Sequence, residues 1–78
     1  MGTIATEDGY QLMIFTHDHA PAHVHIRKNG RTAARIKLEP IEVIDSFLTP
    51  RELRKALRLV EKYRAVALEH WDTIHPGR

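Results

Sequence analysis

The chain has no cysteine, which excludes disulfide bridges, thiolate metal ligands and a thiol nucleophile from its 78 residues. It also has no long hydrophobic run, because the longest runs, "LMIF" and "AVAL", contain four residues each. A membrane-spanning helix needs about 20 apolar residues, so the sequence predicts no membrane segment, and no secretory signal pattern precedes these runs. We therefore expect one cytoplasmic domain spanning residues 1–78, with no membrane partner.

Turn signals divide the first half of the chain into strands. Asp8-Gly9 and Asn29-Gly30 predict two β-hairpins, because these residue types accept the positive φ of tight turns. The predicted strands are "GTIAT", "YQLMIFT", the stretch from Ala22 to Lys28, and "RTAARIKL". Pro21 predicts a loop from His17 to about Ala22, and Pro40 ends the fourth strand. The stretch "PIEVIDSF" adds either a short strand or irregular cover.

Two registers of the second hairpin are open, and they differ in where the histidines point. A two-residue turn at Asn29-Gly30 would put His23 and His25 on the apolar face. A three-residue loop that includes Lys28 would instead separate the apolar and polar faces, so it is the register that we predict. Its pairs are Val24 with Ala34, Ile26 with Thr32, Ala22 with Ile36, His23 with Arg35, His25 with Ala33, and Arg27 with Arg31.

A long helix follows the strands. The stretch "LTPREL" predicts its start, with Thr49 as the N-cap, Pro50 in the first position and Glu52 closing a capping box. Pro76-Gly77 ends the pattern after about 25 residues, or roughly 37 Å. The apolar positions at helical spacing are Leu53, Ala56, Leu57, Val60, Tyr63, Ala67, Trp71 and Ile74.

Two features predict a second subunit or a partner protein. The second strand is apolar on both faces, at Leu12 and Ile14 and at Met13 and Phe15, whereas one helix covers only one face of a sheet. The helix is long for so small a sheet, so its last turns, with Trp71, are expected to overhang and meet a second subunit. We therefore expect a homodimer.

The stretch "HDHAPAHVHI" holds four of the six histidines of the chain. On a strand, His23 and His25 point to the same side about 6.5–7 Å apart, a spacing at which both can ligate one metal ion. A loop carrying His17 and His19 could fold back to complete a tetrahedral zinc or nickel site, with Asp18 orienting an imidazole. Alternatively, these histidines are structural and form hydrogen bonds on an exposed strand face.

A third interpretation is acid–base chemistry. In the predicted register His23, His25, Arg27 and Arg35 share a face. Metal-free cleavage of RNA needs a histidine that titrates near neutral pH and a cation that stabilises the developing negative charge. The spacing of these residues does not decide between acid–base chemistry, metal binding and a structural role.

Basic residues are concentrated in the C-terminal part. Residues 1–48 carry five Lys or Arg and six Asp or Glu, whereas residues 49–78 carry seven and four. Basic residues recur along one side of the predicted helix, and together with those of the second hairpin they could form a nucleic-acid surface. The same side of the helix could equally bind an acidic protein, or be an ordinary solvent-exposed face. The candidate nucleic-acid contacts are Lys28, Arg31, Arg35, Arg51, Lys55 and Arg58. Aromatic side chains on which bases could stack are scarce, because we expect four of the five aromatic residues to lie in the core.

The order of "HAPAHVHI", "ARIKLEP", "FLTPREL" and "LEHW" resembles the bacterial family called domain of unknown function 4160, over about residues 3–73. The family's His-x-Pro-Pro-His-Val-His-Val signature is matched by His19, Pro21, His23, Val24 and His25. Ala22 replaces the second proline, Lys37 replaces a frequent aromatic residue, and Trp71 matches a C-terminal tryptophan. The resemblance implies a gene pair with a second small protein, of the kind interpreted as a toxin–antitoxin module.

The sequence thus predicts an α+β fold, in which a small antiparallel sheet of about four strands, made of two β-hairpins, packs against one long C-terminal helix. The leading hypothesis is a toxin–antitoxin component acting through a partner protein and RNA or DNA, without a cofactor. A metal-independent ribonuclease is one form of it, with His19, His23, His25 and Arg27 as the catalytic candidates. The alternatives are a non-catalytic zinc or nickel protein and a pure interaction module.

Overall fold

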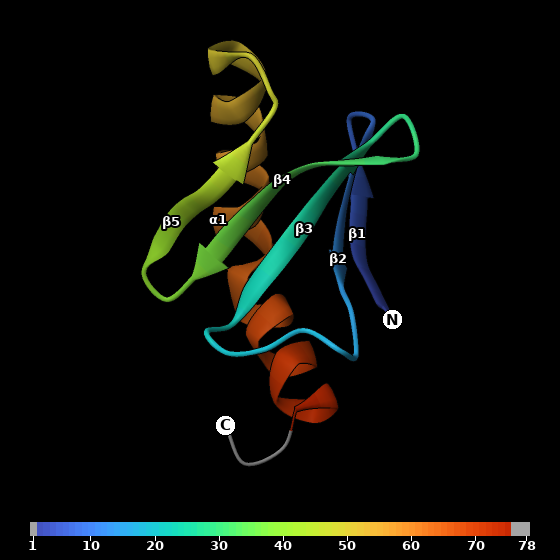
Figure 1. Ribbon diagram of the computed structural model, residues 1–78, viewed down its shortest axis with the longest axis vertical. Helices are drawn as coiled ribbons and strands as arrows, with labels where there is room; N and C mark the ends of the chain where they lie inside the picture. Colours follow the sequence, from blue (N-terminus) through green and yellow to red (C-terminus); the bar gives the residue numbers. More distant parts are fainter. Residues whose placement is uncertain (1, 76–78) are drawn as a thin grey trace.

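The computed structural model describes residues 2–75, which form a five-stranded antiparallel sheet and one helix. The strands lie side by side in chain order, and the helix α1 contacts every one of them (Figure 1). The elements are β1 (Gly2–Glu7), β2 (Tyr10–Ile14), β3 (His23–Lys28), β4 (Arg31–Leu38), β5 (Ile41–Ser46) and α1 (Pro50–Ile74). The predicted α+β class is confirmed, and the fifth strand is formed by the stretch "PIEVIDSF", for which strand and irregular cover were both open.

Both predicted hairpin turns are present. Asp8 and Gly9 have φ of 53° and 83°, and Asn29 and Gly30 have φ of 54° and 76°. Positive φ at both central residues defines the type I′ turn, whose twist matches that of the flanking strands. The sequence pairs Asp-Gly and Asn-Gly therefore set the β1–β2 and β3–β4 connections.

The β3–β4 turn is nevertheless shorter than predicted. Lys28 pairs with Arg31 across a two-residue turn, whereas the predicted three-residue loop would have paired Arg27 with Arg31. The prediction of that loop was wrong, because Asn29 and Gly30 both take the left-handed conformation that a two-residue turn requires.

A β-bulge in the same hairpin restores the separation of the two faces. The register shifts between Ile26 and Arg27, after which Ile26 pairs with Ala34 and Val24 with Ile36. These pairs lie two positions further along β4 than predicted, and an even shift keeps each side chain on its predicted face. Val24 and Ile26 are accordingly 0% exposed.

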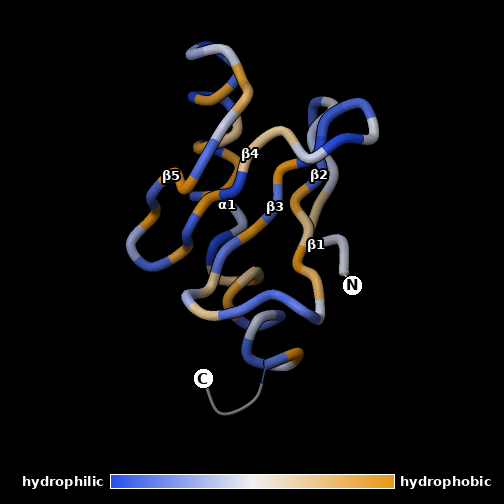
Figure 2. Tube along the Cα trace, in the orientation of Figure 1, coloured by the Kyte–Doolittle hydropathy of each residue, from blue (hydrophilic) through white to orange (hydrophobic). Residues whose placement is uncertain are grey.

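The core lies between the sheet and α1. Apolar and polar residues alternate along the strands, so that one face of the sheet supplies the apolar side chains (Figure 2). The sheet residues of the core include Leu12, Ile14, Val24, Ile26, Ile36 and Leu38, and its buried helix residues are Ala56, Leu59, Val60, Ala67 and Trp71. The expectation that Trp71 overhangs the sheet was wrong, because its side chain is 1% exposed within one chain and packs against His23. The predicted homodimer stays a prediction.

The middle of α1 is fixed to two strands by polar contacts. The Tyr63 hydroxyl donates to Glu7 Oε1 at 2.7 Å and Lys62 Nζ donates to the same oxygen at 2.9 Å, and the Tyr63 hydrogen bond lowers the pKa of Glu7. Arg64 Nε donates to the Leu38 carbonyl at 2.7 Å. These bonds set the position of α1 along the sheet in addition to the apolar contacts.

The start of α1 is as predicted. Thr49 Oγ1 accepts the Glu52 backbone N–H at 3.2 Å, and Glu52 Oε1 accepts the Thr49 backbone N–H at 2.9 Å. Glu52 also pairs with Lys28, which joins the end of β3 to the first turn of α1. The predicted stop at Pro76-Gly77 lies outside the described residues. No helix in residues 2–75 has the length and apolar composition to cross a membrane.

Replacing the N-cap tests the capping box. We expect Thr49→Ala to lower the free energy of unfolding by about 1 kcal/mol, because one helix N–H loses its acceptor. For a domain of this size that corresponds to a melting temperature about 4–8 °C lower. Thr49→Ser keeps the hydroxyl and is the matched control. An Ala variant as stable as the Ser variant by thermal unfolding would contradict the assignment.

Acid titration tests the pair between Glu52 and Lys28. Lys28 and the Thr49 N–H lower the pKa of Glu52 from 4.5 to about 2. Between these values the unfolded state binds more protons, so this contribution to stability is complete above pH 4.5 and is lost as the pH falls towards 2. We expect Glu52→Gln to be less stable than wild type in urea denaturation at neutral pH, with a difference that shrinks with acid. A difference independent of pH would argue against the charge effect.

Candidate functional site

The β2–β3 loop holds the carboxylate of Asp18 in a fixed position. The Asp18 backbone N–H donates to the Phe15 carbonyl at 3.1 Å, and Asp18 Oδ2 accepts the Phe15 backbone N–H at 3.0 Å. A residue that bonds the same neighbour through backbone and side chain closes a tight turn at the end of β2. Its other oxygen, Oδ1, is directed at the histidines of β3.

His25 is one partner of that oxygen. Its Nε2 donates to Asp18 Oδ1 at 3.1 Å, and its ring meets the Phe15 ring edge-on at a centroid distance of 4.6 Å. His23 lies two residues earlier on β3, so the period of the strand places both imidazoles on one face. The two ring centroids are 5.3 Å apart.

His23 is more buried than His25, with 8% of its surface exposed. Its ring lies 5.4 Å from the Trp71 ring, and its Nδ1 lies 2.9 Å from the Pro21 carbonyl oxygen. A carbonyl only accepts, so Nδ1 carries the proton and Nε2 of the neutral ring presents a lone pair. That lone pair is 3.7 Å from Asp18 Oδ1, which is also an acceptor.

These three side chains can surround one cation. Asp18, His23 and His25 each offer one ligand atom, and the three atoms lie within 4.8 Å of one another. Ligands bound to zinc at 2.0–2.2 Å with tetrahedral angles are about 3.3 Å apart. The distances from Asp18 Oδ1 to the Nε2 atoms of His25 and His23, 3.1 and 3.7 Å, fall on either side of that value.

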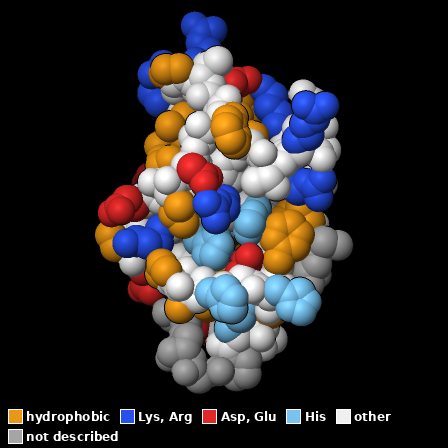
Figure 3. Space-filling model, in the orientation of Figure 1, with side chains coloured by type: hydrophobic (Ala, Val, Ile, Leu, Met, Phe, Trp, Pro, Cys, Tyr) orange, Lys and Arg blue, Asp and Glu red, His pale blue; other side chains and the backbone are white. Residues whose placement is uncertain are grey.

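The loop histidines lie beside this group. His17 and His19 line a cavity of about 300 Å³ that His23 and Arg35 also border. Figure 3 shows histidines gathered on this face around a carboxylate. The predicted set of four histidine ligands is therefore brought to one surface, but among the described residues the group of close ligand atoms has Asp18 in place of His17 and His19.

The two predicted cations of the acid–base interpretation are bound to other groups. Arg27 donates to the Gly30 carbonyl, which directs its guanidinium to the β3–β4 turn. Arg35 pairs with Asp45 of β5, and this pair raises the pKa of Arg35 and lowers that of Asp45. Of the predicted catalytic residues, His23 and His25 lie together, His19 lies on the cavity wall, and Arg27 lies at the turn.

The predicted nucleic-acid residues divide into two regions. Arg35 lies at the histidine cavity, whereas Arg51, Lys55 and Arg58 border a second cavity beside the first turns of α1. Arg31 and Lys28 line a third cavity. Lys28 pairs with Glu52, which borders both the second and the third cavity. Of the predicted contacts, Arg35 therefore lies apart at the histidine cavity, whereas Lys28 and Arg31 of the hairpin lie near the helix cations.

Sequence reasoning missed two members of the histidine site. The sequence pattern gives Asp18 only the supporting role of orienting an imidazole, because its spacing from β3 does not specify how the loop closes on Phe15. Trp71 backs His23 from α1, with ring centroids 5.4 Å apart, and helical spacing gave only its apolar role.

The arrangement permits two kinds of chemistry. His25 and Asp18 form a hydrogen-bonded pair that can hold and release a proton, and the three side chains together form a ligand set for a divalent ion. The ligand set uses the lone pair of His23, and it also requires His25 Nε2, which donates to Asp18 in the proton pair, to give up its proton.

Comparison with known proteins gives a family and no activity. No curated protein and no solved structure is significantly similar to the chain. Residues 9–72 match the family described as "Domain of unknown function (DUF4160)". This match covers β2 to nearly the end of α1 and includes Asp18, His23 and His25. The chain belongs to the DUF4160 family.

Proposed function

We propose that this protein binds one divalent transition-metal ion through Asp18, His23 and His25. The observation that carries the proposal is the approach of His23 Nε2 to Asp18 Oδ1 at 3.7 Å, with the proton of His23 held on Nδ1 by the Pro21 carbonyl. Oδ1 accepts the His25 N–H, and an ion bound between Oδ1 and His23 Nε2 would replace that hydrogen bond and take its third ligand from His25.

A metal ion fits the distance between His23 Nε2 and Asp18 Oδ1 better than a shared proton does. Hydrogen bonds between nitrogen and oxygen span about 2.7–3.2 Å, so 3.7 Å is too long for a proton shared by His23 and Asp18. It is close to the separation of two ligands on one ion, about 3.3 Å. The hydrogen bond from His23 to the Pro21 carbonyl also resembles the outer contacts that orient histidine ligands.

The ligand types narrow the choice of ion. Two imidazoles and one carboxylate suit zinc, iron, nickel and copper, whereas magnesium and calcium prefer oxygen ligands. Three protein ligands leave a position open for water or a further ligand, which is the arrangement of catalytic zinc sites. The neighbouring cavity borders His23, and His17, His19 and Arg35 line it.

The charge of such a site favours an anionic ligand. A divalent ion, one carboxylate and two neutral imidazoles leave one net positive charge facing the cavity. Arg35 lies at the cavity wall and is paired with Asp45, so the ion supplies the uncompensated charge. A phosphate or carboxylate oxygen, or a water whose proton the ion makes more acidic, would take the open position.

Metal-independent cleavage of RNA receives less support from the same geometry. It needs an uncompensated cation beside the histidines, but Arg27 donates to Gly30, and Arg35, which borders the histidine cavity, is paired with Asp45. The toxin–antitoxin role and the second small protein of the gene pair stay predictions that rest on the family resemblance.

A metal titration tests the proposal. We expect Zn²⁺, Ni²⁺ or Co²⁺ to raise the melting temperature, because an ion that binds only the folded state adds about 2.7 kcal/mol at a hundred times its dissociation constant. Calorimetry should give one ion per chain. Asp18→Asn and His23→Ala should each remove the stabilisation, since each deletes one ligand.

Two controls separate this ligand set from the four-histidine alternative. His70→Ala removes an exposed histidine of α1 outside the site and should leave the affinity unchanged. The double change His17→Ala with His19→Ala should also retain one ion per chain, whereas the alternative requires its loss. The proposal fails if none of the three ions stabilises the wild type, or if His23→Ala binds as tightly as wild type.

A further inference from the structure

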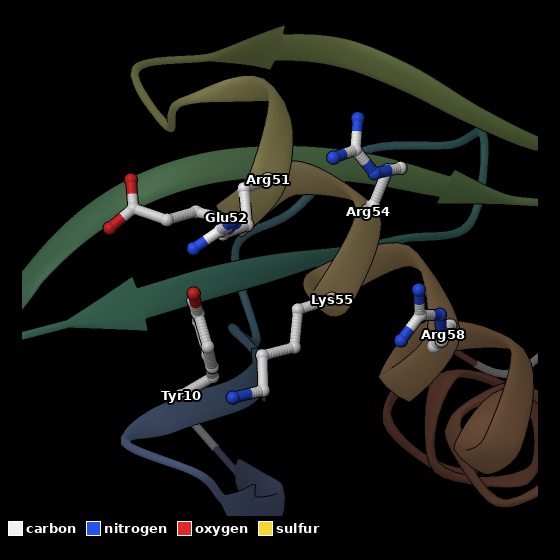
Figure 4. Close-up of a pocket in the computed structure, with 6 residues that line it drawn as sticks. All are labelled: Tyr10, Arg51, Glu52, Arg54, Lys55 and Arg58. Carbon is white, nitrogen blue, oxygen red and sulfur yellow. The ribbon is translucent and has the colours of Figure 1, made fainter.

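Four cations border a cavity at the opposite end of the sheet from the histidines. Arg51, Arg54, Lys55 and Arg58 line a space of about 430 Å³, together with Tyr10 and Glu52. Figure 4 shows all four leaving the first turns of α1, with Arg51 and Lys55 directed towards Tyr10 of β2. None of the four forms an ion pair with any residue in the described range 2–75.

The carboxylate in this cavity does not neutralise them. Glu52 pairs with Lys28 and accepts the Thr49 backbone N–H, and these contacts lower its pKa to about 2. Its charge is therefore already matched by Lys28 at neutral pH. The four cations remain uncompensated, which raises the local concentration of anions.

An exposed aromatic ring lies next to this cavity. Phe47 is 90% exposed, although its backbone N–H is fixed to the Ala33 carbonyl at 2.7 Å. Phe47 and Arg31 line the third cavity, of about 370 Å³, and Glu52 borders both this cavity and that of the four cations. We call this continuous surface the basic end; its residues are Arg31, Phe47, Arg51, Arg54, Lys55 and Arg58.

We propose that the basic end binds single-stranded nucleic acid. Cations that follow a helix match a chain of phosphates, and an exposed ring on a fixed backbone offers a face on which an unpaired base can stack. In a duplex the base faces are stacked on one another, so Phe47 would have no partner. An acidic protein would match the cations but would leave the ring without a role.

This proposal is independent of the metal site. The basic end adjoins the β3–β4 turn and the first turns of α1, whereas the histidines lie by the β2–β3 loop and the last turns (Figure 3). Binding measured in the presence of a chelator therefore reports the basic end alone.

Fluorescence anisotropy of labelled oligonucleotides tests the proposal with the full chain. The probes are an RNA and a DNA strand of mixed sequence and about 12 nucleotides, a length within the range that small binding folds cover. The same DNA strand annealed to its complement is the third probe. We expect saturable binding of at least one single strand, at least tenfold tighter than binding of the duplex.

Matched variants assign the contacts. Lys55→Gln should weaken binding and reduce the slope of log affinity against log salt by about 0.7, the value for one phosphate contact in a single strand. Lys62→Gln removes a cation that pairs with Glu7 and should leave the slope unchanged. Phe47→Leu should weaken single-strand binding about 5- to 150-fold, and Val66→Ala, another exposed apolar change, should not.

Three results would overturn the proposal. They are no binding of either single strand at low salt, a duplex bound as tightly as its single strand, and a Phe47→Leu variant with unchanged affinity. Polyglutamate bound as tightly as the single strands, with no effect of Phe47→Leu, would instead identify an acidic protein surface as the occupant.

Discussion

The burial of one face of α1 against the sheet is the contact on which the rest of the molecule depends. The chain has no disulfide, so the apolar layer between α1 and the strands carries the stability of a small domain. α1 is 25 residues long, or about 37 Å, whereas the longest strand has eight residues and spans about 26 Å. The two ends of α1 therefore lie at opposite ends of the sheet. The first turns bring cations beside the hairpin turns, and the last turns bring Trp71 behind His23.

Local signals in the sequence were enough for most of the fold. Asp-Gly and Asn-Gly set the type I′ turns, and the Thr49 capping box fixed the start of α1, because each depends on a few adjacent residues. The register of β3 on β4 could not be read in the same way. The bulge after the turn is selected by burial of Val24 and Ile26 against α1, which is a tertiary contact. The polar and apolar faces were predicted correctly because burial imposes the same separation in either register.

For the histidine site, the sequence identified the histidines but not the position of the carboxylate that lies between them. His23 and His25 follow from the period of a strand, which is a local property. The position of Asp18 depends on how the loop closes on Phe15, and its spacing from β3 does not specify that path. Phe47 was not identified either, since its neighbours in sequence, Ser46 and Leu48, give no sign that the residue is 90% exposed. Whether an apolar side chain is covered depends on which element lies over it.

The two oxygens of Asp18 connect the loop to the histidines. Oδ2 accepts the Phe15 N–H and closes the turn after β2, while Oδ1 accepts from His25 and faces His23. The carboxylate is therefore part of the fold and part of the site at once. Because His23 packs against Trp71, a ligand that holds Oδ1 and His23 Nε2 also ties the β2–β3 loop to the last turns of α1. Binding at this site and the stability of the domain are then thermodynamically linked, since the free energy of ligation is gained only in the folded chain.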